Sequence, residues 1–235
     1  MTAPLFTQLA GRIPLARHEH VAVLYRGRPE AFRHAAFLGE GLANGDRCHY
    51  LAPRAYHAEM LEHLRGQVAE LDRHLASGAL RLHEGPPDFQ SLRQATQELF
   101  IEAERVGAPA LRWLEEGIWP EEVGFPMPHF FEFHALLNYQ VKHYPSVALC
   151  QYDLEQFEPR YLFQAIAVHR HLIVDETLVR DNPFYIPAEK FIPLAPAERE
   201  RDLAQLFREV GFDIDKLLAA LAGYGRLRPQ GSSFL

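Results

Sequence analysis

Short strand-like runs alternate with longer stretches of helical spacing along most of the chain. This alternation restricts the fold more than any other feature. The strand-like runs lie at 20–25, 48–51, 80–83, 110–115, 147–152 and 171–174. Such an order is typical of parallel strands joined by crossover helices. We therefore expect an α/β fold with three layers and a mostly parallel sheet.

The run at 147–152 is the most apolar of these segments, which predicts a strand at the centre of the sheet. A further strand or hairpin is expected at 177–179. After residue 185 the composition changes, with prolines at 187, 193 and 196. We interpret residues 1–187 as one domain and residues 188–235 as a linker and helical tail.

The tail carries an apolar stripe that must be covered. Helices are predicted at 198–210 and 214–224, and the second has its apolar residues at helical spacing. Such a stripe is buried either on its own domain or across a homodimer. Its members are Ile214, Leu217, Leu218, Leu221 and Tyr224.

The charge balance excludes several partners. Lys and Arg number 24 and Asp and Glu 31, which gives a net charge of −7. No general attraction to nucleic acid or to anionic lipid follows from such a balance. The apolar runs are too short to span a membrane. With two cysteines and no signal peptide pattern, we expect a cytoplasmic protein.

The position that often carries a phosphate-binding loop lacks one here. After the first strand the sequence is Tyr-Arg-Gly-Arg-Pro-Glu, with one glycine and no Lys-Ser or Lys-Thr pair. A loop that binds phosphate needs exposed backbone N–H groups and a lysine. No hydrolase elbow, HExxH or kinase motif occurs either. We therefore assign no catalytic residue and no cofactor.

Polar residues gather where the predicted strands end. In open α/β sheets ligands bind outside the carboxyl ends of the strands. Arg112 is the expected counter-charge of Glu116, and Trp119 is expected to close the apolar side. The alternative is that Arg112 pairs with a carboxylate in a purely structural role and Trp119 fills the core. The strand-end candidates are Tyr25, Glu115, Glu116, Tyr152 and Asp153.

Two histidine pairs, His18/His20 and His169/His171, have the spacing of residues on one face of a strand. That spacing could chelate a metal, with Cys150 and Asp153 as further ligands. The alternative is single histidines hydrogen-bonded at strand ends, with Cys150 an inert core thiol. We favour the alternative and assign no metal.

Four short motifs occur in a fixed order. The first is a His followed by an apolar strand ending in Tyr, at 20–25, and the second is a Gly-Leu-x-x-Gly-Asp turn at 41–46. In the third, Leu-Arg at 111–112 precedes Glu116 and Trp119. The fourth, Leu-Cys-x-Tyr-Asp at 149–153, precedes His169 and Asn-Pro-Phe-Tyr at 182–185.

With these motifs, residues 15–187 resemble the MEDS sensory domain, found in methanogens and methylotrophs and in a regulator of dichloromethane dehalogenase. Two positions depart from the family pattern: Arg170 replaces a usual Pro, and Phe133-His134 replaces a frequent Tyr-Glu. The resemblance implies a KaiC/RecA-like fold without a nucleotide-binding loop. It also implies sensing of small molecules, such as hydrocarbon derivatives.

These observations lead to a non-catalytic sensor that binds a small molecule and acts through its tail or a separate output protein. The rival hypotheses are a metal-assisted enzyme built on Glu116, Asp153 and histidines, and an interaction module with a filled crevice. At the strand ends we expect two facing carboxylates, one of which needs a partner or a raised pKa. The ligand-binding residues predicted are Tyr25, Arg112, Glu116, Trp119, Tyr152, Asp153 and, as weaker members, His20 and His169.

Overall fold

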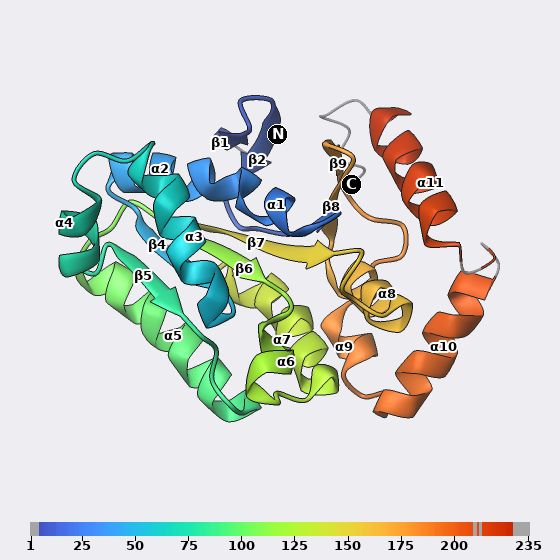
Figure 1. Cartoon of the computed structure of the whole chain (residues 1–235). Coiled ribbons are helices and arrows are strands. Elements are labelled where there is room, and N and C mark those ends of the chain that lie inside the picture. The colour runs from blue at the N-terminus through green and yellow to red at the C-terminus, as the bar shows by residue number, and fades with distance from the viewer. Residues whose placement is uncertain (1–4, 209–210, 212, 228–235) are drawn as a thin grey trace.

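The computed structural model describes residues 5–208, 211 and 213–227, and its centre is a seven-stranded sheet (Figure 1). The strand order is β5-β4-β6-β7-β3-β8-β9, and every pairing except β8 with β9 is parallel. The α/β fold with a mostly parallel sheet is thus confirmed. The strands are β3 (Glu19–Tyr25), β4 (Arg47–Leu51), β5 (Leu80–His83), β6 (Leu111–Glu116), β7 (Ser146–Asp153), β8 (His171–Val174) and β9 (Thr177–Val179).

Strand β7 lies at the middle of the sheet, as its apolar sequence predicted. It pairs in parallel with β3 on one side and β6 on the other, and all eight of its residues are buried. A strand covered on both faces reads as a continuous apolar run because neither face meets water. Polar side chains on β7 therefore lie inside the protein.

Helices cover both faces and form two cores, one on each side of the sheet (Figure 1). Alternate residues of one strand enter different cores: Cys150 and Tyr152 join one, and Val147 and Leu149 the other. The first face is packed by α5 (Phe89–Arg105), α7 (Met127–Gln140) and α8 (Pro159–Val168). The second is packed by α1 (Arg28–Ala31), η1 (Phe32–His34), α2 (Ala35–Asn44), α3 (Arg54–Arg65) and α4 (Leu71–Ala76).

Local sequence signals explain where several helices begin and end. The Asp88 carboxylate accepts the backbone N–H of Ser91 at 2.9 Å and caps α5. Helix α2 ends at Gly45, whose φ of 81° is left-handed and suits glycine. The Pro- and Gly-containing stretch 117–128 holds one short helix, α6 (Trp119–Val123), which has Pro120 in its first turn.

The sequence reasoning missed an N-terminal hairpin. Strands β1 (Leu5–Leu9) and β2 (Ile13–Ala16) pair antiparallel, apart from the main sheet. Their turn places Ala10 and Gly11 at φ of 50° and 71°. Such a turn usually carries Asn-Gly or Asp-Gly, so Ala-Gly gave no clear signal.

The tail packs on the main body (Figure 1). It consists of α9 (Ala188–Phe191), α10 (Pro196–Arg208) and α11 (Ile214–Leu227); α10 lies against α8, and α11 against β9. On α11, Leu217, Leu218 and Leu221 are buried within the chain. The stripe is therefore covered by its own domain. Among the described residues, no helix is long and apolar enough to cross a membrane.

Candidate functional site

The sheet divides the predicted site residues between its two faces. His20 and Tyr152 point toward α7 and α8, whereas Tyr25 and Glu116 point toward η1 and α2. Two polar groups result. We name His20, His134, Cys150 and His169 the histidine–cysteine cluster, and Tyr25, His34, Glu116 and Gln151 the carboxylate network.

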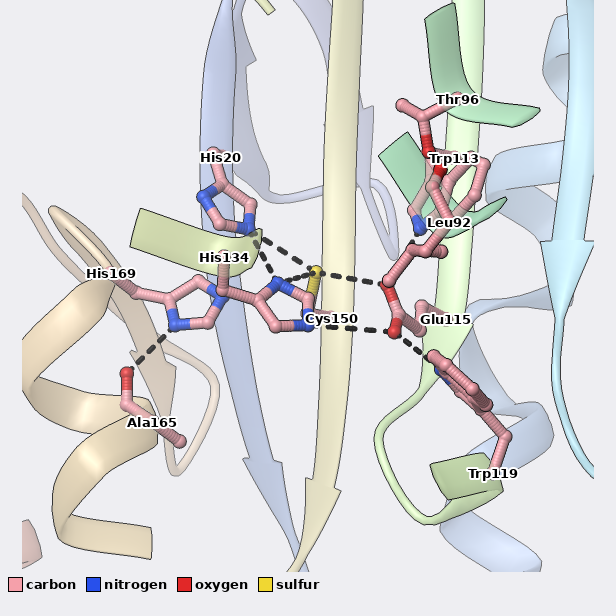
Figure 2. A network of polar contacts seen from close by, with 10 residues as sticks. All are labelled: His20, Leu92, Thr96, Trp113, Glu115, Trp119, His134, Cys150, Ala165 and His169. Atoms are coloured by element: carbon pink, nitrogen blue, oxygen red, sulfur yellow. Dashed lines mark hydrogen bonds and ion pairs between the residues drawn. The ribbon is translucent and has the colours of Figure 1, made fainter. Parts of the chain in front are cut away.

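Four elements supply the histidine–cysteine cluster (Figure 2). His20 comes from β3 and Cys150 from β7, while His134 lies on α7 and His169 directly follows α8. All four side chains are buried. Because His20 pairs with Ala148 in the register, it lies diagonally across from Cys150 on the same face.

The donor atoms of the cluster are close together. His20 Nε2 lies 3.3 Å from His134 Nδ1 and 3.3 Å from Cys150 Sγ, and Cys150 Sγ lies 3.7 Å from His134 Nδ1. One donor atom from each of the four residues falls within 4.8 Å of all the others. The His169 Nδ1–H donates to the Ala165 carbonyl at 2.7 Å, which leaves its Nε2 as the lone-pair nitrogen.

A buried carboxylate borders the cluster. Glu115 Oε1 lies 3.5 Å from His134 Nε2, and its two oxygens accept the indole N–H groups of Trp119 at 2.7 Å and Trp113 at 2.8 Å (Figure 2). Burial raises the pKa of Glu115, but His134 and the indole hydrogen bonds outweigh it and bring that pKa below its ordinary value. Glu115 therefore stays ionised inside the core.

Burial favours the neutral forms of His20, His169 and Cys150. Burial, followed by the charges of neighbouring histidines, places the pKa values of His20 and His169 well below the ordinary range. Burial and the Glu115 carboxylate raise the pKa of the Cys150 thiol well above its ordinary value. Neutral imidazoles keep the lone pairs that bind metal ions, and the thiol keeps its proton until something displaces it.

The carboxylate network occupies the other face. The Tyr25 hydroxyl donates to Glu116 Oε2 at 2.9 Å, and the Gln151 amide donates to Glu116 Oε1. His34 Nδ1 lies 2.5 Å from Gln151 Oε1. Burial raises the pKa of Glu116 to about 8 against the hydrogen bonds from Tyr25 and Gln151, and the charges of Asp153 and Glu115 add to the rise. Glu116 therefore has both hydrogen-bond partners and a raised pKa.

A cavity of about 400 Å³ adjoins this network. It lies at the carboxyl ends of β3 and β8, where Tyr25 and His34 contribute its wall. Apolar side chains such as Val23, Ile173 and Leu218 line it too, and the last of these belongs to α11. At its rim, Arg26 forms an exposed ion pair with Asp215 of the same helix.

The expected pairing of Arg112 with Glu116 is wrong. Arg112 donates to Asp46 at 2.8 Å, to Glu40 at 3.1 Å and to the Phe37 carbonyl at 2.9 Å. Four residues of extended strand span roughly 13 Å, so Arg112 lies near the start of β6 and Glu116 at its end. Arg112 forms a structural ion pair with Asp46 and Glu40, which is the alternative interpretation given in the sequence analysis.

The other predicted residues have different surroundings. Asp153 accepts the backbone N–H groups of Gly27 at 2.9 Å and Glu155 at 3.0 Å, and so holds the loops after β3 and β7. Trp119 is fully buried and bound to Glu115, away from the cavity lining. The Tyr152 ring lies 5.5 Å from that of His169, beside the histidine–cysteine cluster.

The histidine pairs do not chelate as pairs. His18 lies in the turn before β3 with a φ of 68°, and its Nδ1–H donates to the Val141 carbonyl at 2.7 Å. His169 precedes β8 at the end of α8, so the alternation of a strand does not relate it to His171. Instead, His20 from the first pair and His169 from the second both belong to the histidine–cysteine cluster. His20 lies beside Cys150, and His169 lies beside Tyr152.

Sequence reasoning missed His134, His34 and Gln151 as site residues. His134 was visible only as a departure from a family pattern, because its helix position says nothing of its distant neighbours. Gln151 lies inside an apolar strand, where the only signal was a polar residue in a segment expected to be buried on both faces.

The observed class is a parallel α/β domain with a buried polar group on each face of its sheet and without a nucleotide-binding loop. Residues 19–170 match the family model of the methanogen/methylotroph, DcmR sensory domain, MEDS, and the chain belongs to this family. The transcriptional repressor DcmR of Methylorubrum extorquens (strain DM4) is 27% identical over 166 residues, which cover 69% of this chain and 62% of the repressor. Family membership gives the chain a sensory role.

Proposed function

We propose that this chain is a non-catalytic sensor that binds a small organic molecule in the cavity beside Tyr25 and passes the signal through its tail. The observation that carries the proposal is the cavity itself. It joins an apolar wall to the Tyr25 hydroxyl, and Tyr25 is tied to the buried Glu116. Charged side chains line the cavity as well: Arg12, Arg26, Glu30, Arg33, Asp175, Glu176 and Asp215. A concave pocket that combines apolar walls with polar groups aimed into it is typical of small-molecule sites.

The chemistry of the wall indicates the kind of ligand. Val23, Ile173 and Leu218 favour an apolar body, and Tyr25 and His34 offer hydrogen bonds to one polar group. Hydrocarbon or one-carbon derivatives, such as short alcohols and haloalkanes, have this composition. The similarity to a transcriptional repressor supports a regulatory use of such binding.

The tail gives a route for the signal. Asp215 and Leu218 of α11 line the cavity, and Asp215 pairs with Arg26 at the end of β3. A ligand that displaces either side chain changes how α11 contacts the domain. An output protein that binds the tail would detect that change.

The rival metal-assisted enzyme needs Glu116, Asp153 and the histidines in one centre. Glu116 and Asp153 lie on the face of the carboxylate network, while His20 and His169 lie on the other, so the sheet separates them. These residues do not form one catalytic group.

Calorimetry of the full chain with dichloromethane, methanol and longer alcohols tests the proposal, together with mass spectrometry for a co-purified molecule. We expect binding by the wild type and weaker binding by Tyr25→Phe and Glu116→Gln. The matched control Glu62→Gln makes the same chemical change on the exposed surface of α3 and should bind normally. Binding that is unaffected by both cavity variants would place the ligand elsewhere.

A further inference from the structure

The histidine–cysteine cluster has the dimensions of a metal site. In a tetrahedral site with metal–nitrogen bonds of about 2.0 Å and a metal–sulfur bond of about 2.3 Å, two nitrogens lie about 3.3 Å apart and a nitrogen and a sulfur about 3.5 Å. The observed separations between His20 Nε2, His134 Nδ1 and Cys150 Sγ are 3.3, 3.3 and 3.7 Å. Three corners of a tetrahedron are therefore in place.

His169 supplies the fourth corner. Its Nε2 is buried and has no hydrogen-bond partner among the described residues. Its Nδ1–H is fixed on the Ala165 carbonyl, the arrangement by which proteins orient histidine ligands of metals. An unpaired nitrogen in a core is costly, and an ion within reach of it removes that cost.

The surroundings fit a positive ion as well. Glu115 is a fully buried carboxyl group with no Lys or Arg within 4.0 Å in the described part of the chain, and it faces His134 Nε2 at 3.5 Å. A carboxylate behind a ligating histidine is a frequent outer partner in zinc sites. The two indole N–H groups on Glu115 keep that carboxylate in position.

We propose that His20, His134, Cys150 and His169 bind one divalent transition-metal ion of the zinc type, with Cys150 as a thiolate. Three imidazoles and one thiolate suit the borderline-soft character of this ion. On binding, the Cys150 thiol loses its proton to solvent and no electron is transferred. Four protein donors give a closed site, which stabilises the packing of α7 and α8 on the sheet.

This inference is independent of the proposed ligand cavity, since none of the four cluster residues lines that cavity. The full chain, purified without a polyhistidine tag, is stripped with a chelator, incubated with Zn²⁺ or Co²⁺ and desalted. Elemental analysis measures the bound metal. For the Co²⁺ form, near-ultraviolet absorption reports a thiolate–metal bond and visible absorption reports tetrahedral coordination.

We expect one ion per chain in the wild type. Cys150→Ala should lose the thiolate band and bind the metal more weakly by at least about tenfold. The control Cys48→Ala removes the other buried thiol, which lies in the other core, and should bind like the wild type. Should Cys150→Ala fail to fold, His169→Gln keeps the volume and tests the fourth corner. A wild type that retains no ion, or a Cys150→Ala protein that binds as tightly, would overturn the proposal.

Discussion

The two faces of one sheet hold polar groups of opposite character. The histidine–cysteine cluster lies across the start of β3 and the middle of β7, is closed by α7 and α8, and consists of nitrogen and sulfur donors. The carboxylate network lies nearer the strand ends, borders a cavity, and holds a carboxyl group with a raised pKa. A closed group in mid-strand suits a permanently bound ion, whereas a group beside a cavity suits a ligand that comes and goes.

The largest expected effect is a pH dependence of stability that comes from Glu116, on the face of the carboxylate network. Glu116 has an ordinary pKa of 4.5 and about 8 in the fold, so between these values the folded protein holds a proton that the unfolded chain lacks. Stability should therefore fall as pH rises through this window, by about 1.4 kcal/mol per unit and about 5 kcal/mol in all. Glu116→Gln imitates the protonated form and should lose this slope, as measured by urea unfolding at several pH values.

Comparing the two proteins cancels the other titrating groups. Histidines outside the carboxylate network with lowered pKa values, such as His49, act in the opposite direction, because they make stability rise with pH up to about 6.5. Their contribution is the same in both proteins. Parallel curves for the wild type and Glu116→Gln would mean that Glu116 is ionised in the fold.

Removing the metal should have the next largest effect on the free energy of unfolding, and it tests the face that holds the histidine–cysteine cluster. An ion present at 1,000 times its dissociation constant stabilises the folded state by about 4 kcal/mol. Chelation should lower the free energy of unfolding of the wild type by about this amount. The Cys150→Ala protein, which lacks the thiolate and binds the ion at least about tenfold more weakly, should lose less stability on chelation, by at least about 1.4 kcal/mol. An equal response would assign the stabilising ion to another site.

Exchanging the two neighbouring glutamates of β6 sharpens the comparison further. Glu115→Gln removes the carboxylate behind His134 and should weaken metal binding by about 10- to 100-fold, as outer-shell losses usually do. Glu116→Gln, one residue away on the opposite face, should leave metal affinity unchanged. Competition with a coloured chelator measures both, and equal affinities in the two variants would remove Glu115 from the metal site.

The smallest effect concerns the exposed link between the cavity and the tail. The Arg26 side chain is about half exposed and that of Asp215 is mostly exposed. Asp215→Asn should therefore change the unfolding free energy by less than about 1 kcal/mol. It should nonetheless reduce the change in tail proteolysis that a cavity ligand produces. Glu158→Gln, which breaks the exposed pair with Arg160, is the control and should leave that change intact.

Much of the fold could be predicted because it rests on local patterns. The apolar run of β7 marked the centre of the sheet, and Asp88 and Gly45 marked helix ends. The β1–β2 hairpin was missed because Ala10 and Gly11 carry a weaker turn signal than Asn-Gly. Strand-end reasoning placed Tyr25 and Glu116 in one region, and these two do form a hydrogen bond.

The sequence by itself determined the alternation of strands and helices, the central strand and the membership of His20, Cys150 and His169 in family motifs. Tertiary structure alone decided which side chains meet. Glu115 and Glu116 are consecutive, yet β6 directs one to His134 and the other to Tyr25, since neighbouring residues of a strand face opposite ways. His134 and His169 reach Cys150 only because α7 and α8 pack over β7, and such long-range packing leaves no trace in the spacing of residues along the chain.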